Sequence, residues 1–314
     1  GCILVLDTAT AAVRASVSVP CYDPERLADS LQAENSPFLN RALQSYAVGS
    51  VFKPVLAAAA LEAGLQPVFE CTGAVVVDGQ IFRCAGGVPH GQVDLAAALE
   101  KSCNGYFIRL GQQLGAESLL DAAKAFGFGQ SLPLAEGLAA EAGQLPAPQE
   151  LAQSGQLANF SFGQGSLLAA PMQVAALFNT IAADGVYRSP YVLQATLDET
   201  TGQPVETLSH PRGRRVISAQ NAALLRAMLV QVVQQGTAQD AAGLSGGAGG
   251  KTGTAQTGQF TPEGTERCNL WFAGFWPAEK PRYTIVVLQD GAVHTAYSGA
   301  AIFAQVCNVL EAAG

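Results

Sequence analysis

The sequence predicts an α+β domain, with strands at both ends of the chain and helices in the middle. Residues 2–20 alternate apolar and small polar residues, which is the pattern of a β-hairpin. Helices are indicated by an Ala- and Leu-rich segment at 50–63 and by apolar residues at helical spacing in 218–235. The chain ends with a strand from Lys251, strand-like runs at 270–276 and 283–289, and a last helix over 298–312.

Composition narrows the class of protein. The chain has 314 residues, of which 49% are hydrophobic and 13% charged, so a large core is expected. Its net charge is −8, and no basic run is longer than Arg214-Arg215, which argues against a nucleic-acid partner. No stretch has the length of a transmembrane helix, and no signal peptide is evident at Gly1. We expect the native protein to be longer at its N-terminus.

The first half of the chain alternates loops, helices and one clear hairpin. Residues 22–47 are polar and broken by prolines, which predicts a loop with short helical turns. Residues 68–86 predict a hairpin turning at Asp78-Gly79, a dipeptide typical of such turns. A short helix is expected over 95–101. Helical spacing then continues over 106–126, with a break marked by Gly111 and Gly115.

The second half begins with a surface excursion of weak helical character over 129–158. Pro171 suits the first turn of a helix over 171–183. Residues 187–208 predict a hairpin turning at Thr201-Gly202. Ser218 is an N-cap candidate for the helix that follows it.

Three short motifs fit together as one catalytic site. They match S-x-x-K, S-x-N and K-T-G, a set that supplies a serine nucleophile, two lysines and several hydroxyl groups without a histidine. This set indicates acyl transfer on a peptide or a β-lactam. The motifs are Ser50-Val51-Phe52-Lys53, Ser102-Cys103-Asn104 and Lys251-Thr252-Gly253-Thr254.

The first motif predicts a nucleophile beside a base. Pro54 is disfavoured inside a helix, so the helix must begin close to Ser50, where backbone N–H groups favour a developing oxyanion. Lys53 lies one turn along the same face. A buried lysine near a second cation loses basicity and can act as a general base. The alternative interpretation is a capping serine followed by a surface lysine.

The other two motifs complete the hypothesis. Alternation along a strand places Lys251 and Gly253 on one face, and Thr252 and Thr254 on the other. Gly253 leaves room where another backbone must come close. The alternative interpretations are an ordinary strand for this motif and a simple turn for Ser102-Cys103-Asn104.

Two rival sites fit less well. Gly249-Gly250-Lys251-Thr252 suggests a phosphate-binding loop, but Ser245 stands where that motif requires its first glycine. A Ser-His-Asp hydrolase is disfavoured because neither His210, in a proline-rich turn, nor His294, after a strand end, has a matching serine context.

Taken together, the motifs resemble those of class B penicillin-binding proteins, over about residues 3–305. The resemblance implies a transpeptidase domain over 1–314, with a five-stranded antiparallel sheet covered by helices on both faces. The sheet would come from about 2–20 and 251–290, and a helical lobe at about 50–186 would carry the 68–86 hairpin. The residues that carry the resemblance are Asn40-Arg41-Ala42, Gly49–Pro54, His90-Gly91, Ser102–Asn104, Phe162–Gly165, Pro171-Met172-Gln173 and Lys251–Gln256.

The resemblance implies a serine D,D-transpeptidase that cross-links peptidoglycan stems ending in D-Ala-D-Ala and is acylated by β-lactams. Ser50 would be the nucleophile, Lys53 the base and Ser102 a proton relay held between Lys53 and Lys251. Asn104 would bind the stem amide, and Thr252, Gly253 and Thr254 the terminal carboxylate and the oxyanion. No catalytic cofactor is implied.

The resemblance also implies a place and partners in the cell. The enzyme would act at the extracytoplasmic face of the membrane, held by an N-terminal anchor and pedestal absent from this chain. The full-length protein would work with a glycan polymerase in a cell-wall synthesis complex. A serine β-lactamase and a penicillin-sensing receptor domain are alternatives, although the E-x-x-L-N stretch of class A lactamases is missing.

Four residues form a candidate structural zinc site: Cys71, Cys84, His90 and Cys103. With a two-residue turn at Asp78-Gly79, Cys71 faces Gly86 and lies on a diagonal from Cys84, roughly 7 Å away. A disulfide needs β-carbons ~4 Å apart, whereas a tetrahedral metal tolerates the wider gap. Some class B members hold a zinc in this segment with mixed Asp, His and Cys ligands. A Cys71–Cys84 disulfide is the alternative.

Overall fold

A computed structural model describes residues 1–210 and 212–313. Its centre is a five-stranded antiparallel sheet in the order β15-β16-β17-β1-β2. The first strand of the chain therefore lies in the sheet beside the last one, with Cys2 opposite Leu288. The five-stranded sheet expected from the sequence is confirmed. Its strands are β1 (Cys2–Asp7), β2 (Val13–Ser18), β15 (Gly249–Phe260), β16 (Glu266–Trp276) and β17 (Tyr283–Ala292).

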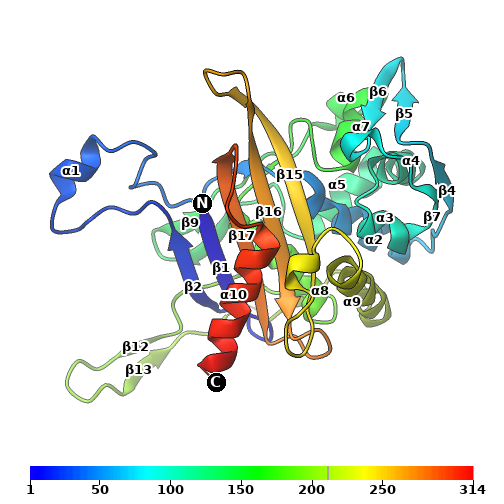
Figure 1. Cartoon of the computed structure of the whole chain (residues 1–314). Coiled ribbons are helices and arrows are strands. Elements are labelled where there is room, and N and C mark those ends of the chain that lie inside the picture. Colours follow the sequence, from blue (N-terminus) through cyan, green and yellow to red (C-terminus); the bar gives the residue numbers. More distant parts are fainter. Residues whose placement is uncertain (211, 314) are drawn as a thin grey trace.

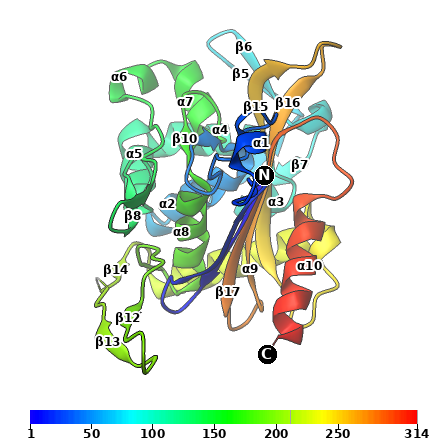
Figure 2. The same cartoon turned by 90° about the vertical axis from the view of Figure 1, so that its left-hand side faces the viewer.

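Helices cover both faces of this sheet, as expected (Figures 1 and 2). The C-terminal helix α10 (Gly299–Ala312) packs on one face, where the ring of Phe303 meets that of Phe272 at a centroid distance of 4.7 Å. The other face is covered by α8 (Pro171–Ala182), in which every residue is buried. Pro171 occupies the first turn of α8, where its missing N–H costs nothing.

The remaining larger helices gather beside the edge strand β15 (Figure 1). Helix α9 packs directly along β15, and its Ser218 caps the helix by accepting a hydrogen bond from the Asn221 N–H. These helices belong to the helical lobe, whose Ser102 and Asn104 line the cleft described below. They are α2 (Lys53–Glu62), α3 (Leu95–Glu100), α4 (Asn104–Leu114), α5 (Ala116–Ala125), α7 (Ser154–Ser161) and α9 (Ala219–Gln234).

The hairpin predicted at 68–86 is shorter than expected. Strands β5 (Ala74–Val77) and β6 (Gln80–Arg83) pair across the Asp78-Gly79 turn, as predicted. The preceding strand β4 (Phe69–Cys71) instead pairs with β7 (Gly91–Val93). The predicted pairing of Cys71 with Gly86 is therefore wrong, because the chain leaves the hairpin and forms a second ribbon.

One helix prediction also needs correction. Gly115 separates α4 from α5 with a φ of 80°, but Gly111 lies inside α4 rather than at a break. A β-carbon at Gly111 would lie 1.9 Å from Ser161 Oγ, so this glycine allows α4 and α7 to pack closely. Helical spacing alone could not distinguish a packing glycine from one that ends a helix.

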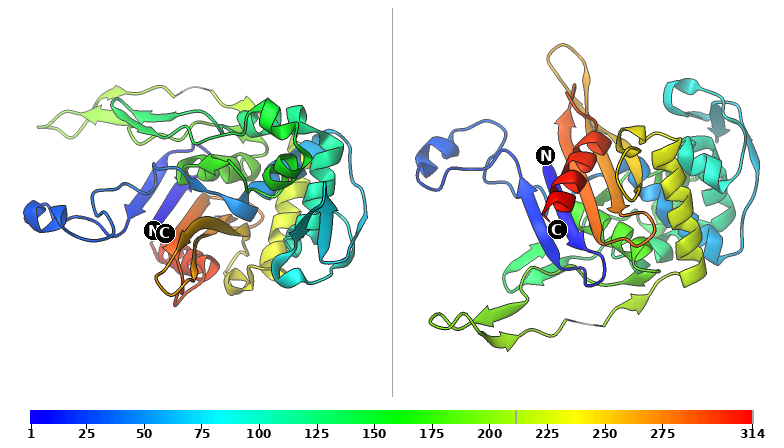
Figure 3. Two further views of the ribbon diagram at one scale, coloured as in Figure 1. Left: turned by 90° about the horizontal axis from the view of Figure 1, so that it is seen from above. Right: turned by 60° about the horizontal axis from the view of Figure 1, so that its bottom comes forward.

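The excursion at 129–158 contains a small hairpin in addition to the expected helical turns. A second hairpin, formed by β12 (Ala195–Leu197) and β13 (Pro204–Thr207), projects from the body (yellow-green in Figure 3). Among the described residues, no helix is both long and apolar enough to cross a membrane. The smaller elements are α1 (Leu27–Leu31), β3 (Tyr46–Ala47), η1 (Gly49–Phe52), η2 (Ala85–Gly87), β8 (Leu132–Ala135), β9 (Leu138–Ala140), α6 (Pro148–Leu151), β10 (Leu168–Ala169), β11 (Val186–Tyr187), β12 (Ala195–Leu197), β13 (Pro204–Thr207), β14 (Arg214–Arg215) and η3 (Gln239–Ala241).

Candidate active site

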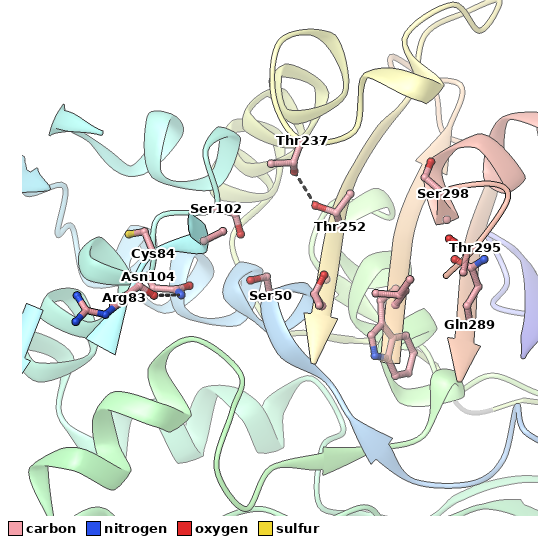
Figure 4. A pocket seen from close by; sticks show the side chains of 16 residues that line it. Ser50, Arg83, Cys84, Ser102, Asn104, Thr237, Thr252, Gln289, Thr295 and Ser298 are labelled. Atoms are coloured by element: carbon pink, nitrogen blue, oxygen red, sulfur yellow. Dashed lines mark hydrogen bonds between the residues drawn. The ribbon is translucent and has the colours of Figure 1, made fainter. Parts of the chain in front are cut away.

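The three sequence motifs meet in a cleft between the helical lobe and the edge strand β15 (Figure 4). The cleft has a volume of about 510 Å³. Ser50 lies between the Ser102–Asn104 turn on one side and β15 on the other. The cleft is lined by six of the predicted residues, Ser50, Ser102, Asn104, Thr252, Gly253 and Thr254.

Ser50 lies in the 3₁₀ turn η1, which leads directly into α2 at Lys53. Pro54 is in the first turn of α2, as its missing donor requires. A β-carbon at Gly253 would lie 3.1 Å from the backbone nitrogen of Val51, so the predicted close approach of another backbone to Gly253 is confirmed.

Lys53 is fully buried and makes three hydrogen bonds with the second motif. Its Nζ donates to Ser102 O at 2.8 Å, to Ser102 Oγ at 3.1 Å and to Asn104 Oδ1 at 2.7 Å. Burial lowers the pKa of Lys53 to about 7, although the nearby thiols of Cys103 and Cys84 oppose this shift. A substantial fraction of Lys53 is therefore neutral at physiological pH.

Asn104 is the first residue of α4 rather than the end of α3. Its Oδ1 accepts the bond from Lys53, and its Nδ2 donates to the backbone oxygen of Arg83 on β6 at 2.9 Å. The carboxamide is therefore held from both sides. The Nδ2 group has two hydrogens, so one remains for a ligand in the cleft.

Lys251 is also fully buried, but its contacts differ from those expected. Its Nζ donates to the oxygen of the next residue, Thr252, at 3.1 Å. No hydrogen bond between Lys251 and Ser102 occurs among the described residues, so a position of Ser102 between two lysines stays a prediction. Burial, together with the charge of Lys53, holds the pKa of Lys251 well below its usual value. The predicted alternation is confirmed, because Gly253 is buried and Thr254 is exposed.

Thr237 is one of several cleft residues that the sequence motifs do not include. Thr237, which follows α9, lies with its hydroxyl oxygen 2.6 Å from that of Thr252 (Figure 4). Two hydroxyl groups that share one hydrogen bond leave one hydrogen for a ligand. Thr237 belongs to no motif that we considered, and only the packing of α9 along β15 brings it to the site.

The four candidate metal ligands converge as predicted. The ligand atoms of Cys71, Cys84, His90 and Cys103 all lie within 4.8 Å of one another. Cys71 Sγ is 3.6 Å from Cys84 Sγ and 3.5 Å from His90 Nδ1, and Cys84 Sγ is 3.9 Å from Cys103 Sγ. All seven cysteines are free. A disulfide would need sulfur atoms ~2.05 Å apart.

This cluster is joined to the catalytic motifs through Cys103. Its sulfur accepts a hydrogen bond from the Tyr106 N–H at 3.4 Å and so caps α4, and its neighbours in sequence are Ser102 and Asn104. The Cys103 thiol also lowers the pKa of Cys84 by hydrogen bonding to it. Three thiols and an imidazole form a donor set that suits a tetrahedral metal ion.

Comparison with known proteins agrees with this geometry. The model of the penicillin-binding protein transpeptidase domain matches residues 1–308. The peptidoglycan D,D-transpeptidase PbpA of Mycolicibacterium smegmatis is 32% identical over all of this chain, which spans 66% of that protein.

Two solved structures are also similar, each with a TM-score of 0.87 and 28% identity over the whole chain. One is the D,D-transpeptidase domain of a peptidoglycan glycosyltransferase from Eggerthella lenta, of which 77% is covered. The other is penicillin-binding protein A from M. tuberculosis as a ceftriaxone acyl-enzyme complex, of which 74% is covered.

The lowered pKa of Lys53 predicts how acylation of Ser50 depends on pH. If Lys53 is the general base predicted from the sequence, its neutral amine is the active form, and the acylation rate should rise with pH through about 7 and level off above it. We would measure the rate with a chromogenic thioester between pH 5.5 and 9, and subtract the rate of Ser50→Ala. A flat profile over this range would contradict the role of Lys53 as base.

Proposed function

This chain belongs to the penicillin-binding protein transpeptidase family, and from that premise we propose that it is a serine D,D-transpeptidase acting on peptidoglycan stems that end in D-Ala-D-Ala. The observation that carries the proposal is the buried Lys53, which is hydrogen-bonded to Ser102 and Asn104 in the cleft that contains Ser50. Such an arrangement supplies a base, a relay and a nucleophile in one place.

In the first step, Ser50 Oγ attacks the carbonyl carbon of the penultimate D-Ala, and the neutral Lys53 amine accepts the hydroxyl proton. The carbonyl oxygen becomes an oxyanion, stabilised by the backbone N–H groups of Ser50 and Thr254. Each such donor is typically worth about 10²–10³-fold in rate. Because β15 is an edge strand, alternate N–H groups point away from β16 and are free for this role.

In the second step, the C–N bond breaks and the terminal D-Ala departs as an amine. The proton travels from Lys53 through Ser102, along the 3.1 Å contact between Lys53 Nζ and Ser102 Oγ. The amine of a neighbouring stem then attacks the ester, returns its proton by the same route and releases Ser50. One peptide bond is broken and one is formed, so no external energy source is required.

The threonine hydroxyls of β15 bind the terminal carboxylate of the donor stem. Thr252 and Thr254 lie on the cleft side of β15, and Thr237 orients the Thr252 hydroxyl. Lys251 lies beneath them, with its Nζ 3.5 Å from Thr252 Oγ1. The remaining hydrogen of Asn104 Nδ2 donates to the stem amide.

A β-lactam undergoes the same attack, but its leaving nitrogen stays tethered to the acyl group and the ester persists. The ceftriaxone acyl-enzyme complex of the similar M. tuberculosis protein supports this step. Since stem peptides are cross-linked outside the cytoplasm, we place the activity at the extracytoplasmic face of the membrane. Glycan strands must be supplied to the site, so we propose a glycan polymerase as the partner of the full-length protein.

We further propose that Cys71, Cys84, His90 and Cys103 hold a structural zinc ion. Four ligands around a tetrahedral zinc, with Zn–S bonds of about 2.3 Å, place sulfur atoms roughly 3.8 Å apart. The two sulfur–sulfur distances of 3.6 and 3.9 Å fit this value. The metal would brace the turn that carries Ser102 and Asn104, and it would take no part in the reaction.

The nucleophile is tested by substitution. Ser50→Ala should abolish covalent labelling by a fluorescent penicillin, because the acyl group would be carried by the Ser50 hydroxyl, whereas the Ser102 hydroxyl beside Lys53 would only relay a proton. Lys53→Ala should be nearly as damaging, since members of one catalytic unit are not additive. Thermal melting would check that both variants fold. Labelling that survives Ser50→Ala in a folded protein would contradict the proposed role of Ser50 as the nucleophile.

The class of enzyme is tested by the lifetime of the adduct. Intact-mass spectrometry after brief exposure to penicillin should show one drug molecule per chain, and the adduct should persist. Rapid return to the free mass, with hydrolysed drug in solution, would identify a β-lactamase. Persistent acylation without transfer of a stem analogue to an added amine acceptor would identify a sensing domain.

Elemental analysis tests the metal. Protein purified without added metal should contain about one zinc ion per chain, and Cys84→Ser should lower both the zinc content and the melting temperature. Cys21→Ser is the matched control, because Cys21 is exposed and is not one of the four candidate ligands. A metal-free protein with a Cys71–Cys84 disulfide in its peptide map would refute the zinc site.

A further inference from the structure

The loop after α7 carries one of the sequence motifs, Phe162-Gly163-Gln164-Gly165, to which the proposed mechanism gives no role. This loop lies against the residue that precedes the nucleophile. The Gly49 N–H donates to the oxygen of Gly163 at 2.8 Å. The contact joins two segments that are more than a hundred residues apart in the sequence.

The approach of these two backbones is too close for any side chain. A β-carbon at Gly163 would lie 2.0 Å from the carbonyl oxygen of Gly49 and 2.6 Å from its carbonyl carbon. On the opposite side, a β-carbon at Gly49 would lie 2.7 Å from the oxygen of Thr254. Gly49 therefore passes between two backbones, that of the Gly163 loop and that of β15.

The carbonyl group that touches Gly163 belongs to the same peptide unit as the Ser50 N–H. A trans peptide is planar, and its C=O and N–H point in opposite directions. The position of the Gly49 oxygen thus sets the direction of the Ser50 N–H. We propose that Gly163 is a positioning residue that aims this N–H into the oxyanion hole, an inference that rests on the proposed acyl-transfer function.

Contacts with neighbouring elements hold the Gly163 loop in place, so it can fix the position of the Gly49 carbonyl. The ring of Phe160 packs against that of Phe52, inside the nucleophile motif, at a centroid distance of 5.2 Å. The ring of Phe162 meets that of Phe82 on β6 at 6.2 Å. The Gly163 N–H donates to Phe160 O at 3.1 Å. A side chain at Gly163 would therefore displace the Gly49 carbonyl and rotate the Ser50 N–H with it.

Gly163→Ala tests this role, and Gly165→Ala is the matched control. Both glycines have positive φ values, of 88° and 78°, so alanine is strained at either position. The β-carbon at Gly165 would meet the Asn159 side chain at 3.2 Å and would not touch Gly49. With a fluorescent penicillin, Gly163→Ala should acylate about 100-fold more slowly, whereas Gly165→Ala should stay close to the wild-type rate.

Two readouts separate positioning from a general loss of structure. The end-point of acylation counts folded protein, so a positioning defect slows the reaction but leaves full stoichiometry. A peptide boronic acid forms a tetrahedral anion on Ser50 that places an oxygen in the hole. Its affinity should also fall by about 10- to 100-fold in Gly163→Ala. A variant with a general loss of structure would instead lose stoichiometry and melting temperature.

The outcomes are distinct. A folded Gly163→Ala with the wild-type rate and boronate affinity would overturn the inference, as would an equal defect in Gly165→Ala. If Gly163→Ala does not fold, Phe162→Leu loosens the same loop without adding an atom beside Gly49. That variant should then acylate more slowly with full stoichiometry, and an unchanged rate would count against the role. Failure of the wild-type protein to acylate would contradict the proposed function rather than this inference.

Discussion

The active site depends on the burial of one lysine. Lys53 is removed from water entirely, which would be costly for an unpaired ammonium group. Its three hydrogen bonds to Ser102 and Asn104 compensate for the lost water and also join α2 to the turn before α4. The same burial lowers the pKa of Lys53, so one packing constraint shapes the cleft and also favours the neutral amine that the proposed base requires.

A second constraint is the approach of three backbones around Ser50. The turn η1, the strand β15 and the loop after α7 can meet only because glycine stands at each contact, at Gly49, Gly163 and Gly253. Hydrogen-bond donors of the backbone are thereby held without the rotamer freedom of side chains. Donors held in advance of the reaction are what stabilisation of an oxyanion requires.

The cysteine and histidine cluster lies beside the β5–β6 hairpin, which has little apolar packing. The β5–β6 hairpin packs into a small apolar cluster, in which Val77 meets Ile108 of α4 and Ala158 of α7. Cys84, which directly follows the hairpin, has its sulfur 3.9 Å from that of Cys103, the residue before α4. Because Asn104 bonds both Lys53 and the β6 backbone, the position of the hairpin bears directly on the position of Lys53.

Short patterns in the sequence were enough to predict several local features of this structure. The helix begins close to Ser50, as Pro54 requires, and Lys251 and Gly253 share one face because a strand alternates. The Asp78-Gly79 turn likewise follows from its two residues.

Contacts between distant segments were decided by tertiary structure alone. Cys71 pairs with β7 instead of continuing the hairpin, Thr237 reaches Thr252, and Lys251 bonds Thr252 rather than Ser102. Each of these depends on how separate elements pack, and no short pattern in the sequence carries that information. The meeting of Gly163 with Gly49 is of the same kind, because two glycines far apart in the chain give no sign of contact until the fold brings their backbones together.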